Sequence, residues 1–235
     1  MKPGYARGDD HGVSGTAVAR AQTRRGEGAA ASDGARALLL ESAQRYAEQM
    51  ADSPVLDYLA GCRGITDPVL IGRLGLGFVG KPSPGHERFR GMLSIPYLRY
   101  DAMGSTVATI RFACATDGCA HEHHDQTTSL PGHEPRLYNT RDLYARVDEL
   151  CICLGEWDTI TALARGLHAV GVQDAEGWRP YMARAFRGYK KVMLFTRAED
   201  RGRSMRWANE VAAQIPTAVI APFPNGSEPG TIHTG

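Results

Sequence analysis

The feature that most constrains the fold is an alternation of short apolar segments with helical segments after residue 149. The predicted strands are LCICL (150–154), HAVGV (168–172), KVMLF (191–195) and TAVIA (217–221). Helices are expected between them, over residues 158–166, 178–186 and 200–214. A βαβαβαβ order indicates a mostly parallel sheet with helices on its faces. We therefore expect an α/β fold, α+β overall, in which this sheet forms a domain over residues 149–222.

The segment before this sheet is different in character. Pro54 and Pro68 suit the first turns of short helices, and a longer helix is expected before them, from Ser32-Asp33 to about residue 51. Residues 77–85 form a predicted loop. MLSIPYL and STVATIRFAC follow it and are typical of a β-hairpin. We expect a helical and β subdomain over 34–148, preceded by a disordered tail over 1–33, with a flexible tail over 223–235.

Composition excludes some classes of protein. The 235 residues carry a formal net charge of +1 and contain no apolar run of 18 residues, so no membrane span is expected. The N-terminus lacks the apolar core of a secretory signal. Five cysteines are an odd count, and Cys151 and Cys153 lie in an apolar strand, where they are predicted core residues. A reducing, cytoplasmic location is therefore expected.

Acidic residues follow two of the predicted strands. Glu156 and Asp158 follow the first strand, and Glu199 and Asp200 follow the third. Ligands of open parallel sheets gather at the carboxyl ends of strands. If these strands are neighbours, the acids could hold one divalent cation such as Mg²⁺. The alternative is that they are helix-start residues that the helix dipole favours.

Several motifs occur in one order along the chain. GEWDTITAL, HAVGV and KVMLFTRAEDRG form the later part, and DYLAGCRGI, LGLGF, RFRGMLSIPYLRYDAMGSTVATIRF and RLYNT form the earlier part. Together they resemble the core of DnaG-type primases, with its TOPRIM domain, and are most similar to primase-like proteins of bacteriophages that infect actinobacteria. The resemblance runs from about residue 58 to residue 221.

This resemblance implies a function. The family makes RNA primers on single-stranded DNA from nucleoside triphosphates, by nucleotidyl transfer that depends on Mg²⁺ or Mn²⁺. It also implies a replicative helicase or another replication protein as partner, and the host cytoplasm as the location. By resemblance, the residues that guide template and nucleotides are Arg88, Arg90, Arg111, Arg136 and Asn139. For Arg136, a structural salt bridge is the alternative.

The chain departs from the family's acidic motifs. The catalytic Glu falls on Leu154 and the first Asp of the second motif falls on Arg197, while Asp158 is retained and Glu199 replaces an Asp. The remaining candidates are Asp158, Glu199 and Glu156 for catalysis, and Asp158, Glu199 and Asp200 for Mg²⁺. Because Leu154 cannot bind a metal and Arg197 is a fixed cation, we expect weak metal binding. An impaired primase, a non-catalytic TOPRIM-like protein that binds nucleic acid or a partner, and a TOPRIM nuclease all stay open.

Basic residues concentrate between Arg179 and Arg206, where nine Lys or Arg accompany only two acids. Such a cluster suits a phosphate backbone, and Trp178, Tyr181 and Tyr189 lie among its members and could stack on bases. The alternative is a solvated face with aromatic core residues. The candidate binding residues here are Lys190, Lys191, Arg197, Arg201 and Arg203.

A second cluster contains metal-ligating residue types. Cys114, Cys119, His121 and His123 are candidate zinc ligands, because thiolate and imidazole suit tetrahedral Zn²⁺. Their spacing matches no common zinc finger, so a polar surface loop is the alternative.

Overall fold

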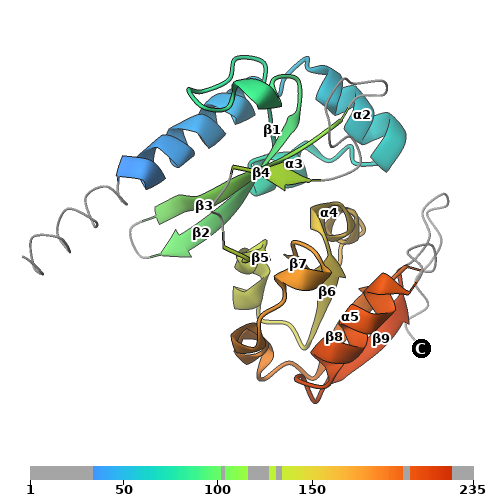
Figure 1. The fold of residues 1–235 in the computed structure, drawn as a ribbon. Coiled ribbons are helices and arrows are strands. Elements are labelled where there is room, and N and C mark those ends of the chain that lie inside the picture. The colour runs from blue at the N-terminus through green and yellow to red at the C-terminus, as the bar shows by residue number, and fades with distance from the viewer. Residues whose placement is uncertain (1–33, 102–103, 116–126, 131–133, 198–201, 224–235) are drawn as a thin grey trace, which may run out of the picture.

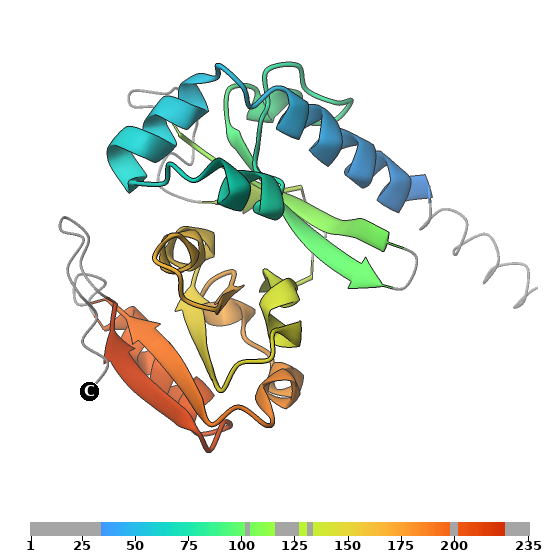
Figure 2. The ribbon, with the colours of Figure 1, turned by 180° about the vertical axis from the view of Figure 1, so that it is seen from behind.

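Two sheets face one another in the computed structural model, which describes residues 34–101, 104–115, 127–130, 134–197 and 202–223. The first sheet has the strand order β1-β2-β3-β4, and the second has the order β5-β7-β6-β8-β9. In Figure 1 the first sheet and its helices lie above the second, and Figure 2 shows the same two layers from behind.

The helices of the N-terminal part begin and end at the residues that favour such positions. A helix over residues 34–48 is followed by α2 (Pro54–Arg63) and α3 (Pro68–Leu74). Both α2 and α3 begin at a proline, and both are followed by a glycine in the left-handed conformation, Gly64 and Gly75. The three helices predicted for this region are confirmed.

The first sheet is antiparallel throughout. It contains β1 (Gly77–Phe78), β2 (Leu93–Asp101), β3 (Gly104–Ala113) and β4 (Thr128–Ser129), with a 3-10 turn η1 (Glu87–Phe89) before β2. The predicted hairpin is β2 and β3. The loop predicted from residue 77 is wrong at its start, because Gly77 pairs with Ser94. A Cβ at Gly77 would lie 2.4 Å from the carbonyl carbon of Tyr46, so only glycine lets β1 pass so close to the first helix.

The second sheet confirms the predicted fold class. It contains β5 (Leu137–Tyr138), β6 (Glu149–Leu154), β7 (Ala169–Val172), β8 (Lys191–Thr196) and β9 (Ala218–Pro222). Strands β6 to β9 are parallel, and only β5 pairs antiparallel, with β7. The helical elements between the strands are η2 (Thr140–Tyr144), α4 (Glu156–Ala164), η3 (Ala175–Gly177), η4 (Pro180–Phe186) and α5 (Arg203–Ala212).

The predicted helices of this part need correction. In place of the α-helix predicted over 178–186 there is the 3-10 helix η4, which begins only at Pro180, and in which Met182 N donates to Arg179 O and Arg187 N to Arg184 O. The helix expected from residue 158 begins at Glu156. The helix expected from residue 200 is described from Arg203, because residues 198–201 lie outside the described part of the chain.

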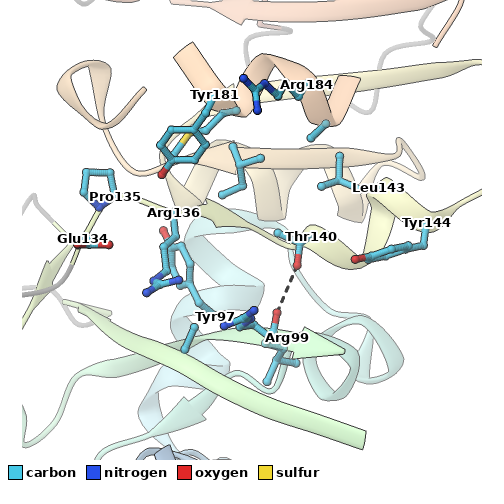
Figure 3. Close-up of a pocket in the computed structure, with 15 residues that line it drawn as sticks. Tyr97, Arg99, Glu134, Pro135, Arg136, Thr140, Leu143, Tyr144, Tyr181 and Arg184 are labelled. Atoms are coloured by element: carbon cyan, nitrogen blue, oxygen red, sulfur yellow. Dashed lines mark hydrogen bonds between the residues drawn. The ribbon is translucent and has the colours of Figure 1, made fainter. Parts of the chain in front are cut away.

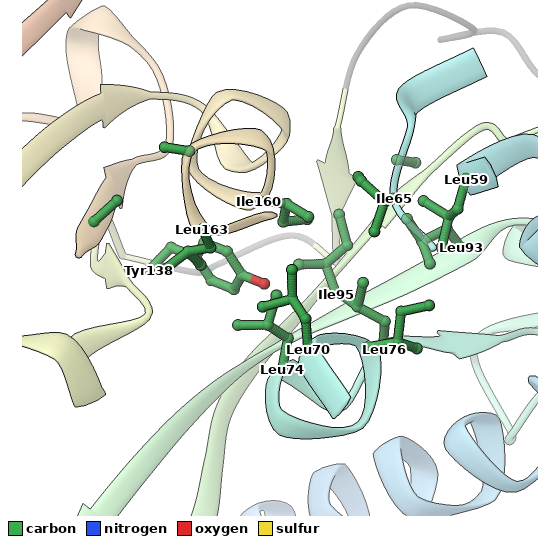
Figure 4. Packing of buried hydrophobic residues seen from close by; sticks show 14 of the residues in the cluster. Leu59, Ile65, Leu70, Leu74, Leu76, Leu93, Ile95, Tyr138, Ile160 and Leu163 are labelled. Carbon is green, nitrogen blue, oxygen red and sulfur yellow. The ribbon is translucent and has the colours of Figure 1, made fainter. Parts of the chain in front are cut away.

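Alternation along β6 divides the core of the second sheet. Cys151 and Cys153 face the cluster that contains Ile160 of α4, whereas Leu150 and Ile152 face the cluster that contains Trp207 of α5. The α4 cluster continues into the first sheet through Leu93 and Ile95, so one core joins the two sheets (Figure 4). Cys151 and Cys153 are buried, as predicted. In the described residues, no helix is long and apolar enough to cross a membrane.

Candidate functional site

The carboxyl ends of β6 and β8 lie next to each other, because the two strands are parallel and Ile152 is opposite Leu194. A cavity of about 530 Å³ opens at these ends, between the second sheet and the first. Leu154, Glu156, Asp158 and Arg197 all line it. The residues that the sequence places after the two strands are thus brought together, at the edge where parallel sheets bind ligands.

Gly155 positions the acidic residues of this cavity. Its φ of 92° is strained for any side chain, and its backbone N donates to Val172 O at 2.6 Å, which ends β6 in a sharp turn. The helix α4 begins at the next residue, so Glu156 and Asp158 both lie in its first turn. Both carboxylates are buried, at 2% and 5% relative exposure.

Asp158 is paired with Arg197. The guanidinium donates through Nε to Oδ2 at 2.8 Å and through Nη2 to Oδ1, so it contacts both carboxylate oxygens. Ser204 Oγ accepts from Arg197 N at 2.8 Å, and the guanidinium lies 5.4 Å from the centre of the Phe223 ring. These contacts fix Arg197 over Asp158 in the fork geometry that arginine forms with carboxylates.

Glu156 is held by residues of the first sheet. Tyr97 of β2 donates its hydroxyl hydrogen to Glu156 Oε1 at 2.6 Å. Arg111 Nε of β3 forms an ion pair with the same oxygen at 2.7 Å, although the Nε–H bond of Arg111 does not point at that oxygen. Arg111 also donates through Nη2 to Thr127 O at 2.7 Å. Burial and the nearby carboxylate raise the pKa of Tyr97 well above its usual value, which keeps the phenol protonated.

These contacts bear on the predicted metal site. Leu154 offers no donor atom, both oxygens of Asp158 face a guanidinium, and Glu156 is held by Tyr97 and Arg111. In the described part of the chain, no group of three or more His, Cys, Asp or Glu could hold a metal ion. Glu199 and Asp200 lie outside that part. The described residues therefore do not fit the carboxylate and water ligands that Mg²⁺ prefers.

The candidate zinc residues are also only partly described. Cys114 directly follows β3 and is buried, in contact with the core of the first sheet. Cys119, His121 and His123 lie outside the described residues.

Besides Arg111 of β3, two predicted nucleic-acid residues lie at the turn η1 before β2. Arg88 is exposed, donates to Ser129 O at 3.2 Å and lies 4.7 Å from the centre of the Phe89 ring. Arg90 is exposed and donates to Gly80 O at 2.8 Å. On the side of the second sheet, Arg203 lines the cavity and pairs with the exposed Glu176 at 2.8 Å. Arg201 lies outside the described residues.

The basic run between Arg179 and Arg206 does not form a single patch. Lys190 and Lys191 lie at the amino end of β8, opposite the cavity, and pair with Asp148 at 2.7 Å and Glu149 at 3.6 Å. The hydrogen bond that Lys190 donates to Asp148 raises the pKa of Lys190. The six residues of β8 separate Lys190 from Arg197 by roughly 20 Å. The two halves of the basic run therefore lie at opposite ends of the strand.

The remaining candidates divide between the core and the surface. Asn139 is buried, with a φ of 52°, and its side chain donates to Ala169 O at 2.8 Å. Arg136 forms no ion pair with any described residue, and it lines a second cavity. Trp178 packs in the core, Tyr189 donates to Leu143 O at 3.0 Å, and Tyr181 is 60% exposed.

Sequence reasoning missed two residues of the site. Tyr97 shares a strand face with Leu93 and Ile95, and this period-two pattern was the only signal that it points inward. Arg63 of α2 lies with its guanidinium 4.5 Å from the centre of the Trp157 ring and donates to Tyr58 Oη at 3.0 Å. No sequence motif indicates that Arg63 lines the cavity. Arg63 reaches the cavity because α2 packs near α4.

The chain is similar in sequence to a phage protein and in fold to a bacterial primase. The chain is 35% identical over 147 residues to the gene 57 protein of Mycobacterium phage D29, which covers 62% of this chain and 92% of that protein. A crystal structure of the Aquifex aeolicus primase, with its zinc-binding and RNA polymerase domains, matches with a TM-score of 0.59 and 17% identity. That match covers 82% of this chain and 55% of the primase chain, so this chain spans about half of its length. No protein-family model matches the chain. The fold is primase-like.

Proposed function

The chain belongs to the family of the gene 57 protein of Mycobacterium phage D29, and on this premise we propose that it is a phage protein that binds single-stranded nucleic acid in a TOPRIM-like cleft and makes little or no primer. The primase-like fold and the position of the cavity at the strand ends support the proposal. The observation that carries it is the pairing of Arg197 with both oxygens of Asp158.

The pairing changes what the cavity can bind. In metal-dependent nucleotidyl transfer, carboxylates hold divalent cations, and these cations bind the phosphates. Here a guanidinium already neutralises Asp158, and a second one lies beside Glu156. At about 4 Å and an effective dielectric constant near 20, the repulsion between two unit charges is about 4 kcal/mol, and it doubles for a divalent ion. A cation is therefore disfavoured at the two paired carboxylates, and the described lining as a whole, with four arginines and three acidic residues, has a small net positive charge that suits a phosphate.

Several arginines could meet such a phosphate. Arg63, Arg197 and Arg203 line the cavity, and the side chains of Arg197 and Arg203 are 45% and 53% exposed. Guanidinium groups form paired hydrogen bonds with phosphate oxygens, so these residues can bind a nucleic-acid backbone or the phosphates of a nucleotide without a metal. The protein would then act as a nucleic-acid-binding subunit, and its partner would be a helicase or another replication protein.

Residual primer synthesis is the second candidate function, because Asp158 keeps a carboxylate in the cavity. It requires Arg197 to leave Asp158, and it requires Glu199 and Asp200 to join Asp158 around Mg²⁺ or Mn²⁺. The two candidates therefore differ in their dependence on divalent cations.

One pair of measurements separates them. The fluorescence anisotropy of a labelled single-stranded oligonucleotide gives the affinity, and labelled nucleotides on a single-stranded template report primer synthesis with Mg²⁺ or Mn²⁺. We expect binding that persists in EDTA and weakens about 20-fold between 50 and 200 mM salt, for about three phosphate contacts. The double variant Arg63→Ala/Arg203→Ala should flatten this salt dependence, while the exposed Arg146→Ala should leave it unchanged. Primers made by the wild-type protein, or binding lost in EDTA, would overturn the proposal.

A further inference from the structure

We propose that a second cavity, separate from the one described above, binds unpaired bases of a single-stranded nucleic acid. The cavity has a volume of about 610 Å³ and lies between β2 of the first sheet and the elements η2 and η4 of the second (Figure 3). The two cavities have no lining residue in common, but they are neighbours, because Tyr97 lines this one and donates to Glu156 of the cavity at the ends of β6 and β8. The inference therefore goes beyond the proposed function and does not require it.

Two tyrosines supply the surfaces for stacking. Tyr144 of η2 is 76% exposed and Tyr181 of η4 is 60% exposed, and both line this cavity. In the part of the chain that the structure describes, no other aromatic side chain is as open to solvent. Figure 3 shows Tyr181 reaching from η4 over the cavity, and Tyr144 at its other side. An aromatic ring held open beside a cavity is a surface on which a base of any sequence can stack.

Three arginines give the cavity its charge. Arg99 comes from β2, Arg136 precedes β5, and Arg184 comes from η4. Within the described residues, none of the three forms an ion pair or a side-chain hydrogen bond, unlike Arg111, Arg197 and Arg203 in the first cavity. Among the described residues that line the second cavity, Glu134 is the only acidic one, so this lining carries a net positive charge and suits an anionic ligand.

The rest of the lining explains why the ligand would be a base with its phosphates. Leu137, Leu143 and Met182 supply apolar surface, and Thr140 donates to Leu98 O at 3.5 Å between the two sheets. The volume is within the range of small-molecule sites. Apolar walls, two open aromatic rings and three arginines together match the two parts of a nucleotide, a flat ring and a negative phosphate.

The test compares two oligonucleotide probes. One is a labelled oligothymidine, and the other is an oligomer of the same length in which several central bases are missing. The double variant Tyr144→Ala/Tyr181→Ala should weaken binding of the oligothymidine about 5- to 100-fold, the effect expected when a stacking ring is lost, and should leave the abasic oligomer unaffected. Tyr144→Phe/Tyr181→Phe keeps the rings and should bind like the wild type.

Arginine variants complete the test. Arg184→Ala should weaken binding of both probes by a similar factor, because it removes a phosphate contact that does not depend on bases. Arg187→Ala is the matched control, since Arg187 is exposed, follows η4 directly and does not line the cavity. Equal binding of the oligothymidine by the Tyr→Ala double variant and the wild type would overturn the proposal, as would an equal loss for both probes. Arginines and tyrosines are also common at protein interfaces, and a site that binds only protein would give the first of these results.

The two proposals fail separately. If Arg63→Ala/Arg203→Ala binds the oligothymidine like the wild type, the first cavity is not used. The tyrosine variants still report on the second cavity in that case.

Discussion

Arg197, which directly follows β8, holds both carboxylate oxygens of Asp158 in the first turn of α4. A related ion pair occurs two residues earlier, where Arg111 Nε of β3 lies 2.7 Å from Glu156 Oε1. Each buried carboxylate at the start of α4 is thus neutralised by an arginine from a neighbouring strand, one from each sheet. In this primase-like cleft, the cations beside the two carboxylates are the guanidinium groups of the protein itself.

The first prediction concerns the stability of the Arg197–Asp158 pair. Arg197→Ala leaves a buried carboxylate without its partner, and we expect a loss of about 1–3 kcal/mol in the free energy of unfolding. The loss is below that of a fully buried pair, because the Arg197 side chain is 45% exposed. Urea denaturation measures it. The double variant Arg197→Ala/Asp158→Asn should recover part of the loss. If Arg197→Ala alone were as stable as the wild type, the pair would contribute nothing to the free energy of unfolding.

The second prediction concerns Tyr97, which connects the two sheets. Tyr97→Phe removes the hydroxyl that donates to Glu156 at 2.6 Å, and hydrogen bonds to buried charged groups contribute about 2 kcal/mol. We expect a loss of that size in urea denaturation. Tyr181→Phe, at an exposed tyrosine, is the matched control and should change the free energy of unfolding by less than about 0.5 kcal/mol. Equal stability of the two variants would argue against the contact.

The third prediction concerns alkaline pH. Burial raises the pKa of Cys151 from 9.0 to about 12, so the folded protein holds this proton more tightly than the unfolded chain does. The stabilisation is complete below pH 9 and is lost as the pH rises from 9 towards 12, by at most about 1.4 kcal/mol per pH unit for one group. Cys151→Ala should show a shallower decline over this range in urea denaturation. Parallel declines for the two proteins would contradict the assignment.

The fourth prediction concerns Asn139, for which the primase resemblance implies contact with nucleic acid or nucleotide. Its φ of 52° and the hydrogen bond that its side chain donates to Ala169 O indicate that Asn139 also stabilises the fold. Asn139→Gly removes the side chain with its hydrogen bond but adopts the left-handed conformation without strain, and we expect it to cost about 1 kcal/mol. Asn139→Ala adds the left-handed strain and should cost about 1–2 kcal/mol more. Thermal unfolding of the two variants separates the contributions, and equal melting temperatures would exclude the strain.

The sequence predicts the elements of this fold well because their signals are local. Pro54 and Pro68 begin helices, and the apolar runs from Leu150 onwards form the parallel sheet. The end of η4 at Phe186 is predicted correctly, but its start at Pro180 and its type are not. The type is missed because α and 3-10 helices use similar residues and differ in which carbonyl each N–H reaches.

The site is harder to predict because its contacts join distant parts of the chain. The sequence indicates that Leu154, Asp158 and Arg197 share one sheet edge, since parallel strands end together. It gives no sign that Tyr97 and Arg111 reach Glu156, because this depends on how the two sheets pack. Nor does it separate Lys190 from Arg197, which are close along the chain but lie at opposite ends of β8.

The most direct test of the central claim is the binding of Mn²⁺, followed by the paramagnetic resonance of the free ion. The wild type and Asp158→Asn should take up Mn²⁺ equally weakly, because Arg197 already neutralises Asp158. Leu154→Glu/Arg197→Asp, which restores two carboxylates at the strand ends, should gain at least one site. Tight uptake by the wild type that Asp158→Asn abolishes would contradict the account, because it would show that Asp158 binds a metal ion in spite of Arg197.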